Sequence, residues 1–224
     1  MDAATLQSKV YMGYGKAAQR IGYNFDVYRP SAPMYSPPTP SYALSPLNKI
    51  TTLPASFTVG ATKFNFEKAP NYKDMVWSGL FDGTAVHAGD YLNNSTHGVY
   101  FVAAMPDILP ILCVRCNHTV SLVCPPVNTA VGVLGYNGTT AASETSVMTQ
   151  WPAFIMYMQK GRVTEVGLPM DLPSPYYTVL LPSYAGLLLR SGDIVKDEMA
   201  QRYVVSVAEL SMFGWRLECQ IAVT

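Results

Sequence analysis

Residues 89–103 read GDYLNNSTHGVYFVA, and a related segment, GDIVKDEMAQRYVVS, follows at residues 192–206. In both stretches a Gly-Asp pair precedes a short apolar run, and a tyrosine stands eleven residues after the glycine. Each pattern predicts a turn, a short strand, a polar loop and a second strand, which together form a small antiparallel β unit. The repeat therefore predicts two related β units in one chain.

The repeated positions divide into turn residues and core residues. Glycine supplies a turn-compatible backbone and an aspartate side chain caps it, which assigns the repeated turns to Gly89, Asp90, Gly192 and Asp193. The apolar strands that follow predict repeated core positions at Tyr100, Val102, Tyr203 and Val205. Asp90 and Asp193 are paired carboxylates in sequence register, but a turn cap requires no catalytic role.

The repeat extends outward from these turns. Residues 74–103 align with residues 177–206 without a gap, and six of the thirty positions are identical, including Val76 with Val179 and Gly83 with Gly186. With a small gap, Cys113 aligns with Cys219 in similar strand segments. This pattern favours a duplication, and the alternative is that two β-meanders share Gly-Asp turns by convergence.

The predicted fold class is mainly β, with two related small antiparallel β units, each a barrel or a sandwich. The first unit is expected at residues 74–124 and the second at 176–224, because Val, Ile, Leu and Tyr gather in short runs there. Residues 111–123 are predicted to form one strand. Residues 125–175 are expected to form a long irregular connection, within which residues 151–158 are predicted to form one strand that crosses between the units.

Residues 1–24 are predicted to contain an N-terminal α-helix. Its apolar positions fall at helical spacing on one face: Leu6, Val10, Tyr14, Ala17, Ala18 and Ile21. The opposite face carries Lys9, Lys16, Gln19 and Arg20. The helix is either a surface helix packed on its own domain or a docking helix at a boundary between subunits.

Residues 25–73 are predicted to form a Pro-rich extended arm. Seven prolines fall within residues 30–54, and no charged residue occurs from 31 to 48. Proline excludes a helix and a central strand, so an extended, polyproline II-like conformation is expected. The arm is expected to lie on a surface, either its own or a partner's, through Tyr35, Pro37, Pro38 and Tyr42. The alternative is a flexible linker.

The composition predicts a surface that partner subunits cover. The 224 residues have zero net charge, and only 13% of them are charged. Zero net charge promotes association, and interfaces are depleted in charge and enriched in Tyr and Met. The alternative is a compact β domain with a polar, uncharged surface. No apolar run is long enough to span a bilayer and the N-terminus lacks signal-peptide features, so no membrane partner is expected.

Candidate chemistry is limited to one Cys/His segment. Cys113, Cys116, His118 and Cys124 have the residue types of a zinc site. A strand at this position would place Cys113 and Cys116 on opposite faces, so we expect free thiols and no bound metal. A metal site built from the three histidines, His87, His97 and His118, is also disfavoured, because no His-x-His pair occurs. We therefore expect no catalytic residue, no metal and no cofactor.

Several segments carry a resemblance to a known family. Residues 1–7, 13–18 and 28–30 (MDAATLQ, GYGKAA and YRP), with 81–84 (FDGT), 110–117 (PILCVRCN) and the Gly-Asp segments, resemble an uncharacterised family of tailed-bacteriophage and prophage virion structural proteins. The repeated unit also resembles the small β-barrels of phage head-completion, neck and tail-hub proteins. The resemblance implies a virion location and no catalytic residues.

This resemblance implies a non-enzymatic subunit that forms or bridges oligomeric rings at the head–tail junction, as an adaptor, neck or collar protein. The expected partners are copies of itself and neighbouring virion proteins, near the portal or in the neck, tail or baseplate. Non-specific contact with DNA in a lumen is compatible with a neutral chain. The alternatives are a tail or baseplate hub protein, a host- or glycan-binding virion module and a small metal-dependent β enzyme.

Overall fold

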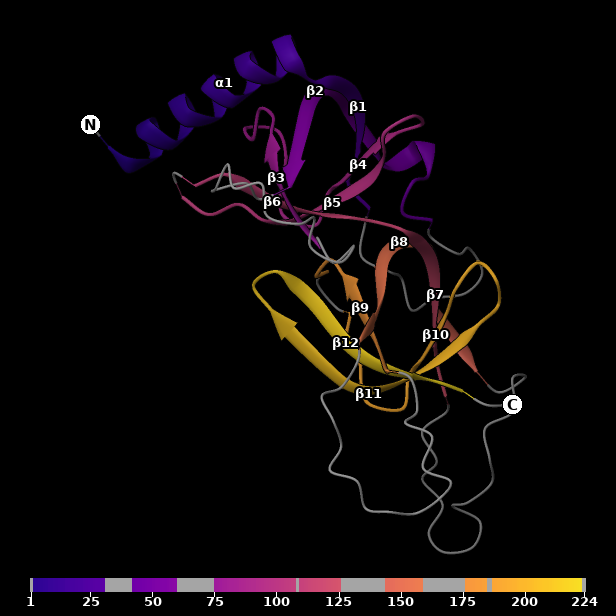
Figure 1. The fold of residues 1–224 in the computed structure, drawn as a ribbon. Helices are drawn as coiled ribbons and strands as arrows, with labels where there is room; N and C mark the ends of the chain where they lie inside the picture. The colour runs from indigo at the N-terminus through magenta and orange to yellow at the C-terminus, as the bar shows by residue number, and fades with distance from the viewer. Residues whose placement is uncertain are drawn as a thin grey trace, which may run out of the picture.

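The computed structural model describes residues 2–30, 42–59, 75–107, 109–125, 144–158, 176–184 and 187–222. The chain begins with helix α1 (Ala3–Ile21), and the rest of the described chain is mainly β. Figure 1 shows α1 and a first β-barrel stacked on a second β-barrel. The predicted fold class, with two related antiparallel β units and an N-terminal helix, is confirmed.

The first barrel is closed by six antiparallel strands in the order β1-β2-β3-β6-β5-β4. Its strands are β1 (Tyr23–Tyr28), β2 (Lys49–Val59), β3 (Val76–Leu80), β4 (Tyr91–Asn94), β5 (Gly98–Ala104) and β6 (Ile111–Arg115). A single turn of 3-10 helix, η1 (Pro46–Asn48), leads into β2. Pairing of β4 with β1 closes the cylinder and leaves no open edge at that point.

The second barrel repeats this topology in the order β7-β8-β9-β12-β11-β10. Its strands are β7 (His118–Cys124), β8 (Thr145–Met158), β9 (Tyr176–Leu181), β10 (Ile194–Lys196), β11 (Arg202–Ser211) and β12 (Gly214–Ile221). Each strand of the first barrel therefore has a counterpart six strands later. The two units are barrels of one topology.

The strand register is also repeated. Leu92 pairs with Tyr100 across β4 and β5, and the residues 103 positions later, Val195 and Tyr203, pair across β10 and β11. A register shift follows Val102 in β5 and Val205 in β11, again 103 residues apart. A bulge inserts one unpaired residue and increases local twist, so both barrels bend at the same place.

The predicted boundaries of the first unit are wrong, because the barrel begins at β1 and not at residue 74. Strands β1 and β2 fall inside the segment that was predicted to be an extended arm, and they pair with each other. Pro54 lies within β2, opposite Asn24. Proline was expected to exclude this strand, but alternating apolar residues of β2 such as Leu53 and Ala55 are buried and stabilise it.

The boundary between the two units is also corrected. The single strand predicted at residues 111–123 is two strands, β6 and β7, which belong to different barrels. Strand β8 belongs wholly to the second barrel, where it pairs with β7 and β9, so it does not cross between the units. The short link at Cys116 and Asn117 is therefore the connection between the barrels.

The gap-free alignment fails upstream of the Gly-Asp turns. Trp77 pairs with Cys113 and Tyr177 pairs with Cys219, so the counterpart of Trp77 is Tyr177, one hundred residues later. Val76 therefore matches Tyr176 and not Val179. The second unit has three more residues than the first between this position and its Gly-Asp turn. The pairing of Gly83 with Gly186 lies outside the described residues.

Strand β5 is buried on both faces because it belongs to two apolar cores. Tyr100 and Val102 point into the first barrel, where Tyr100 stacks on Phe57 with ring centroids 3.9 Å apart. Phe101 and Ala103 pack instead with residues of the second barrel. This explains why residues 99–104 form one continuous apolar run.

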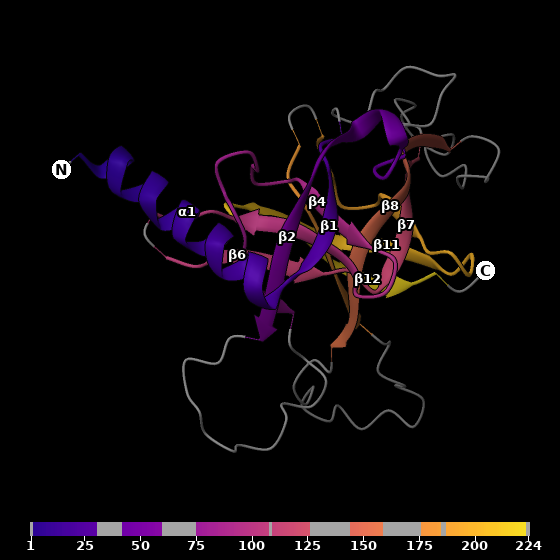
Figure 2. The same cartoon turned by 90° about the horizontal axis from the view of Figure 1, so that it is seen from above.

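Helix α1 lies on the first barrel through its C-terminal half (Figure 2). Gly15 and Ala18 are buried, and a Cβ atom on Gly15 would lie 3.0 Å from the Cβ of Asp82. The predicted apolar face is only partly covered, because Leu6 is 37% and Ile21 is 61% exposed. Small residues allow the helix to approach the barrel closely, and Tyr11 packs beside them against the core of the first barrel.

Candidate functional site

The two Gly-Asp turns are built by the same contacts. Gly89 and Gly192 have φ angles of +97° and +94°, a conformation that favours glycine. The Gly89 amide donates to the Val102 carbonyl at 2.8 Å, and the Gly192 amide donates to the Val205 carbonyl at 2.8 Å. Each turn is therefore hydrogen-bonded to a strand of its own barrel, β5 in the first and β11 in the second.

The aspartates of these turns differ in their cationic partners. Arg29 binds Asp90 through two parallel hydrogen bonds, at 2.9 Å to Oδ1 and 2.7 Å to Oδ2, and also donates to the Ala85 carbonyl. In the second barrel Cys124 occupies the place of Arg29, beside Asp193. Burial, followed by the Asp193 carboxylate, raises the pKa of Cys124 to about 12. The two carboxylates therefore lie in separate turns, and the contacts of each carboxylate stabilise its own turn.

The repeated core residues fill their own barrels. Tyr100 and Tyr203 are buried at matching positions, and each makes an edge-on contact with the aromatic residue of the third strand, Trp77 or Tyr177. Val102 and Val205 are also buried. The hydroxyl of Tyr203 donates to Asp197 at 3.0 Å. These residues determine how each barrel packs.

The barrels are joined by an aromatic contact. The hydroxyl of Tyr91, in the first barrel, donates to the Pro152 carbonyl of the second at 2.8 Å, and its ring lies edge-on to Trp151. In return, the hydroxyl of Tyr184 donates to the Gly89 carbonyl at 2.8 Å. Trp151 is fully buried between these tyrosines. Reciprocal hydrogen bonds around a buried indole fix the two barrels as one body.

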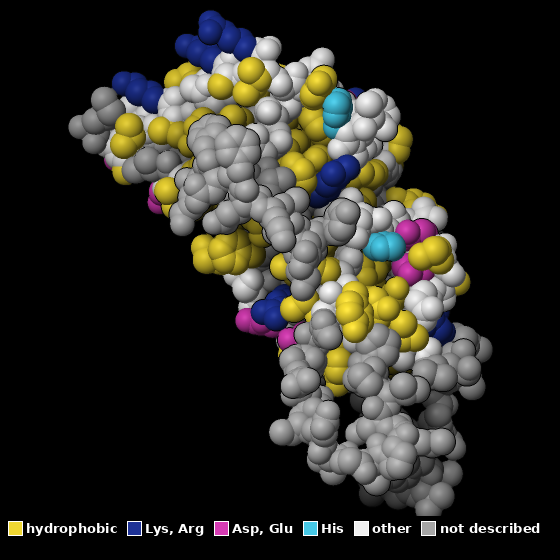
Figure 3. Space-filling view, viewed as in Figure 1, with side chains coloured by type: hydrophobic (Ala, Val, Ile, Leu, Met, Phe, Trp, Pro, Cys, Tyr) yellow, Lys and Arg dark blue, Asp and Glu magenta, His cyan; other side chains and the backbone are white. Residues whose placement is uncertain are grey.

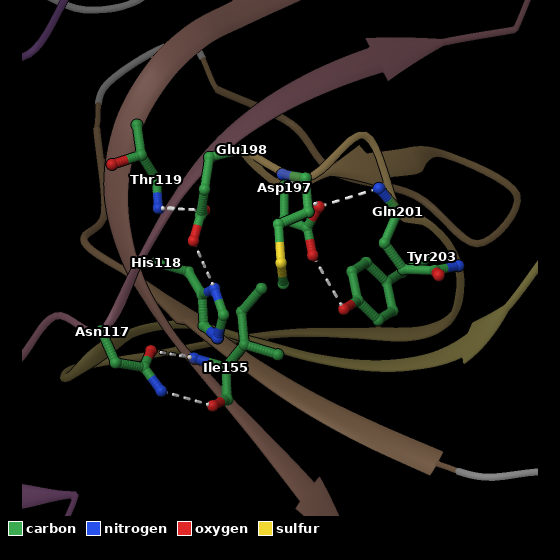
Figure 4. A network of polar contacts seen from close by, with 9 residues as sticks. Asn117, His118, Thr119, Ile155, Asp197, Glu198, Gln201 and Tyr203 are labelled. Carbon is green, nitrogen blue, oxygen red and sulfur yellow. Dashed lines mark hydrogen bonds and ion pairs between the residues drawn. The ribbon is translucent and has the colours of Figure 1, made fainter.

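Figure 4 shows the polar contacts between the β10–β11 turn and the start of β7. The Glu198 carboxylate accepts hydrogen bonds from the His118 ring and from the Thr119 amide, both at 2.9 Å. Burial acts to raise the pKa of Glu198, but the hydrogen bonds from Thr119 and His118 lower it overall. Asp197 caps the same turn through the amides of Met199 and Gln201. These contacts hold the β10–β11 turn against the start of β7.

The Cys and His residues that were considered as zinc ligands are separated by the fold. Cys113 is buried in the first core, Cys116 packs against the core of the second barrel, and His118 contacts Glu198. Across the described ranges no group of three or more metal-ligating side chains comes together. The other two histidines differ in setting, since His87 is exposed and His97 stacks on Tyr23 with centroids 3.8 Å apart.

Only part of the predicted arm can be located. Tyr35, Pro37 and Pro38 lie outside the described residues, and the exposed Tyr42 is described. The next residue, Ala43, is fully buried, and the Asn48 side chain donates to its carbonyl at 3.2 Å. Ala43 and Leu44 therefore pack against the core, whereas Tyr42 and Leu47 remain exposed.

A group of exposed apolar residues lies on the β11–β12 hairpin, where Val207, Leu210, Met212 and Phe213 are each between 46% and 73% exposed. Figure 3 shows hydrophobic side chains at the projecting end of the second barrel and Lys and Arg side chains along the helix. Sequence reasoning missed this surface, although Met212-Phe213-Gly214 between two apolar strands is a recognisable hairpin signal.

Comparisons with protein families, with curated proteins and with solved structures found no match to this chain. Within the part of the chain that the structure describes, no helix is both long and apolar enough to cross a membrane.

Proposed function

We propose that the chain is a non-enzymatic structural subunit of a tailed-phage virion, which forms or bridges rings at the head–tail junction. In this role it assembles in the cytoplasm of the bacterial host and remains in the particle. It acts by contact with copies of itself and with neighbouring virion proteins.

The observation that carries this proposal is a rigid double barrel with apolar side chains exposed on two projecting elements. On the first barrel, Leu6 and Met12 of α1 are exposed, and on the second barrel the β11–β12 hairpin exposes Leu210, Met212 and Phe213. Clustered apolar exposure of this kind is typical of protein–protein contact sites. Because the chain also has zero net charge, it lacks the repulsion that keeps monomers apart.

The link between the barrels supports a bridging role. The Tyr91–Pro152 and Tyr184–Gly89 hydrogen bonds connect one barrel directly to the other. The two barrels share a topology but present different surfaces, since the first carries the helix and the second carries the longer hairpin. A rigid body with two unlike ends suits contact with two unlike neighbours.

The proposal is tested in a phage whose copy of this coding sequence is interrupted. Filled heads and separate tails should accumulate, and a plasmid copy of the wild-type sequence should restore joined, infectious particles. A matched control plasmid carries Leu188→Ser, which changes an exposed residue outside both projecting elements and should also restore them. Normal yields of joined particles without the protein would refute the proposal.

A further inference from the structure

The outward face of α1 carries a row of cations. Lys9, Lys16 and Arg20 are spaced by seven and four residues, so at about 100° per residue they fall within an arc of about 40°. The buried Gly15 and Ala18 lie on the opposite side of the helix, against the first barrel. All three cations are exposed, and at a rise of about 1.5 Å per residue the row is about 16 Å long. The row is therefore the outermost line of the helix.

Within the described residues, this basic row has no acidic partner. Elsewhere in that part of the chain most cations are paired with a carboxylate, namely Arg29, Lys49, Lys196, Arg202 and Arg216. Residues 2–22 contain three basic side chains and one acidic side chain, Asp2, a net charge of +2. Asp2 stands seven residues before Lys9, about 10 Å along the helix. The basic row is therefore free to bind an external anion.

The apolar residues beside the row argue against a lipid surface as that anion. Leu6 and Met12 are 37% and 48% exposed, but they lie about 60° to either side of the row. A helix that binds in a lipid surface presents one continuous apolar face to the lipid. The outermost line of α1 is cationic instead, so a partner must bring its negative charges to that line.

Double-stranded DNA has the charge distribution that this row fits. It carries one negative charge per about 1.7 Å of its axis, so each cation of the row meets a phosphate in any register. An acidic protein would have to place its carboxylates in one matching register. Single-stranded nucleic acid is bound by aromatic stacking, but in α1, which is described over its whole length, both tyrosines, Tyr11 and Tyr14, are half-buried away from the row.

We propose that the outward face of α1 binds the phosphate backbone of double-stranded DNA through Lys9, Lys16 and Arg20. Contacts with phosphates alone carry no sequence information, so this binding has no sequence preference. Figure 1 shows α1 on the side of the first barrel that faces away from the second barrel, which leaves the row accessible to a long ligand. The contact goes beyond the structural role proposed above, which names only protein partners.

The test measures binding of the full-length protein to a labelled DNA duplex of about two helical turns, by fluorescence anisotropy over a salt series. The wild type should bind with a dissociation constant of about 1–100 μM at physiological salt, equally to two duplexes of unrelated sequence. Neutralising three phosphates predicts a slope of about −2.7 for the logarithm of the binding constant against that of the salt concentration. Combining Lys9→Gln, Lys16→Gln and Arg20→Gln should weaken binding about tenfold or more and bring the slope close to zero.

Two control variants separate the row from charge in general. Lys9→Arg with Lys16→Arg keeps both charges and should bind like the wild type. Lys49→Gln removes one positive charge from the first barrel, where Lys49 pairs with Asp26, and should also bind like the wild type. Its matched variant Lys16→Gln should reduce the slope by about 0.9. Circular dichroism checks that each variant keeps its fold, since glutamine and arginine are as favourable in a helix as lysine.

A second readout locates the contact. Acetylation of lysines followed by mass spectrometry should show that the duplex protects Lys9 and Lys16 but not Lys49 or Lys196. A wild type that does not bind the duplex, or a triple variant that binds it as tightly as the wild type, overturns the inference. Binding to phosphatidylglycerol vesicles without binding to the duplex also overturns it, in favour of a lipid surface.

The two proposals can fail separately. If the protein does not bind DNA but the interrupted phage still accumulates unjoined heads and tails, the virion role stands and the DNA contact falls. If the row binds DNA but phage particles join without the protein, the DNA contact stands and the virion role falls.

Discussion

Asp90 and Asp193 hold the same backbone position in the two barrels. Each carboxylate accepts a hydrogen bond from the amide three residues earlier, at 2.8 Å from His87 and 2.7 Å from Arg190. Among the residues that the structure describes, only Asp90 also pairs with a cation, Arg29. The turn itself is therefore the repeated feature, and the ion pair is an addition in the first barrel.

The first prediction compares the two turns. Asp90→Ala should lower the free energy of unfolding by about 2–3 kcal/mol, because it removes charged hydrogen bonds and leaves Arg29 without its partner. Asp193→Ala should cost about 1–2 kcal/mol, because the groups that lose a partner, the Arg190 amide and the Cys124 thiol, are uncharged. Urea denaturation of both variants measures the difference. Equal losses would show that Arg29 contributes nothing to stability.

The repeat in the sequence was sufficient to predict two related β units but not their limits. The Gly-Asp turns and the tyrosines are local signals, and they fall where the structure has turns and buried strands. Strand β2 was missed because Pro54 suggested an arm, whereas pairing with β1 and β3 overrides that local preference. Strands β6 and β7 were merged because a two-residue link between apolar strands carries no glycine or proline.

The second prediction concerns the junction between the barrels. Trp151 is fully buried between Tyr91 and Tyr184, so Trp151→Ala should cost about 3–5 kcal/mol. It should also separate the unfolding of the two barrels, which in the wild type is expected to be a single transition. Differential scanning calorimetry reports both effects. A wild type with two well-separated transitions would contradict the single rigid body.

The third prediction concerns acid stability. The Glu144 side chain is 2% exposed, and it pairs with Lys196 and Arg202. Burial acts to raise the pKa of Glu144, but these two cations lower it below its ordinary value of 4.5. A carboxylate with a lowered pKa in the folded state stabilises the fold above about pH 4.5, and this contribution is lost as the pH falls through the folded-state pKa.

The measurement is urea unfolding of the wild type and of Glu144→Gln between pH 3 and pH 7. The wild type should lose stability on acidification, and the variant should be less stable at pH 7 but show a shallower dependence on pH. A variant with the same pH slope as the wild type would show that Glu144 does not carry this dependence.

The fourth prediction concerns the thiols. All four cysteines are free, and burial raises the pKa of Cys219 to about 12 and that of Cys113 further. The thiolate is the reactive form, so native protein should react slowly with maleimide at pH 8. Denatured protein without reductant should show four thiols, and metal analysis should find no zinc. Two thiols, or stoichiometric zinc, would contradict this account.

The exposed elements were the least predictable part of the candidate site. The helical period identified α1, but it predicted that Leu6 and Ile21 would be buried together, whereas contact through Gly15 and Ala18 leaves both exposed. Which face of a helix packs depends on the shape of the barrel beneath it, which helical periodicity does not encode. The exposure of the hairpin tip likewise depends on the extension of β11 beyond its pairing with β10.

The most direct test of the proposed virion role is electron cryo-microscopy of purified particles of a phage that carries this coding sequence. The account predicts density for the double barrel, with α1 on the first barrel, repeated around the tail axis at the head–tail junction. The β11–β12 hairpin of each copy should lie against a neighbouring protein. Particles that infect normally but contain neither this density nor peptides of the chain by mass spectrometry would contradict the account.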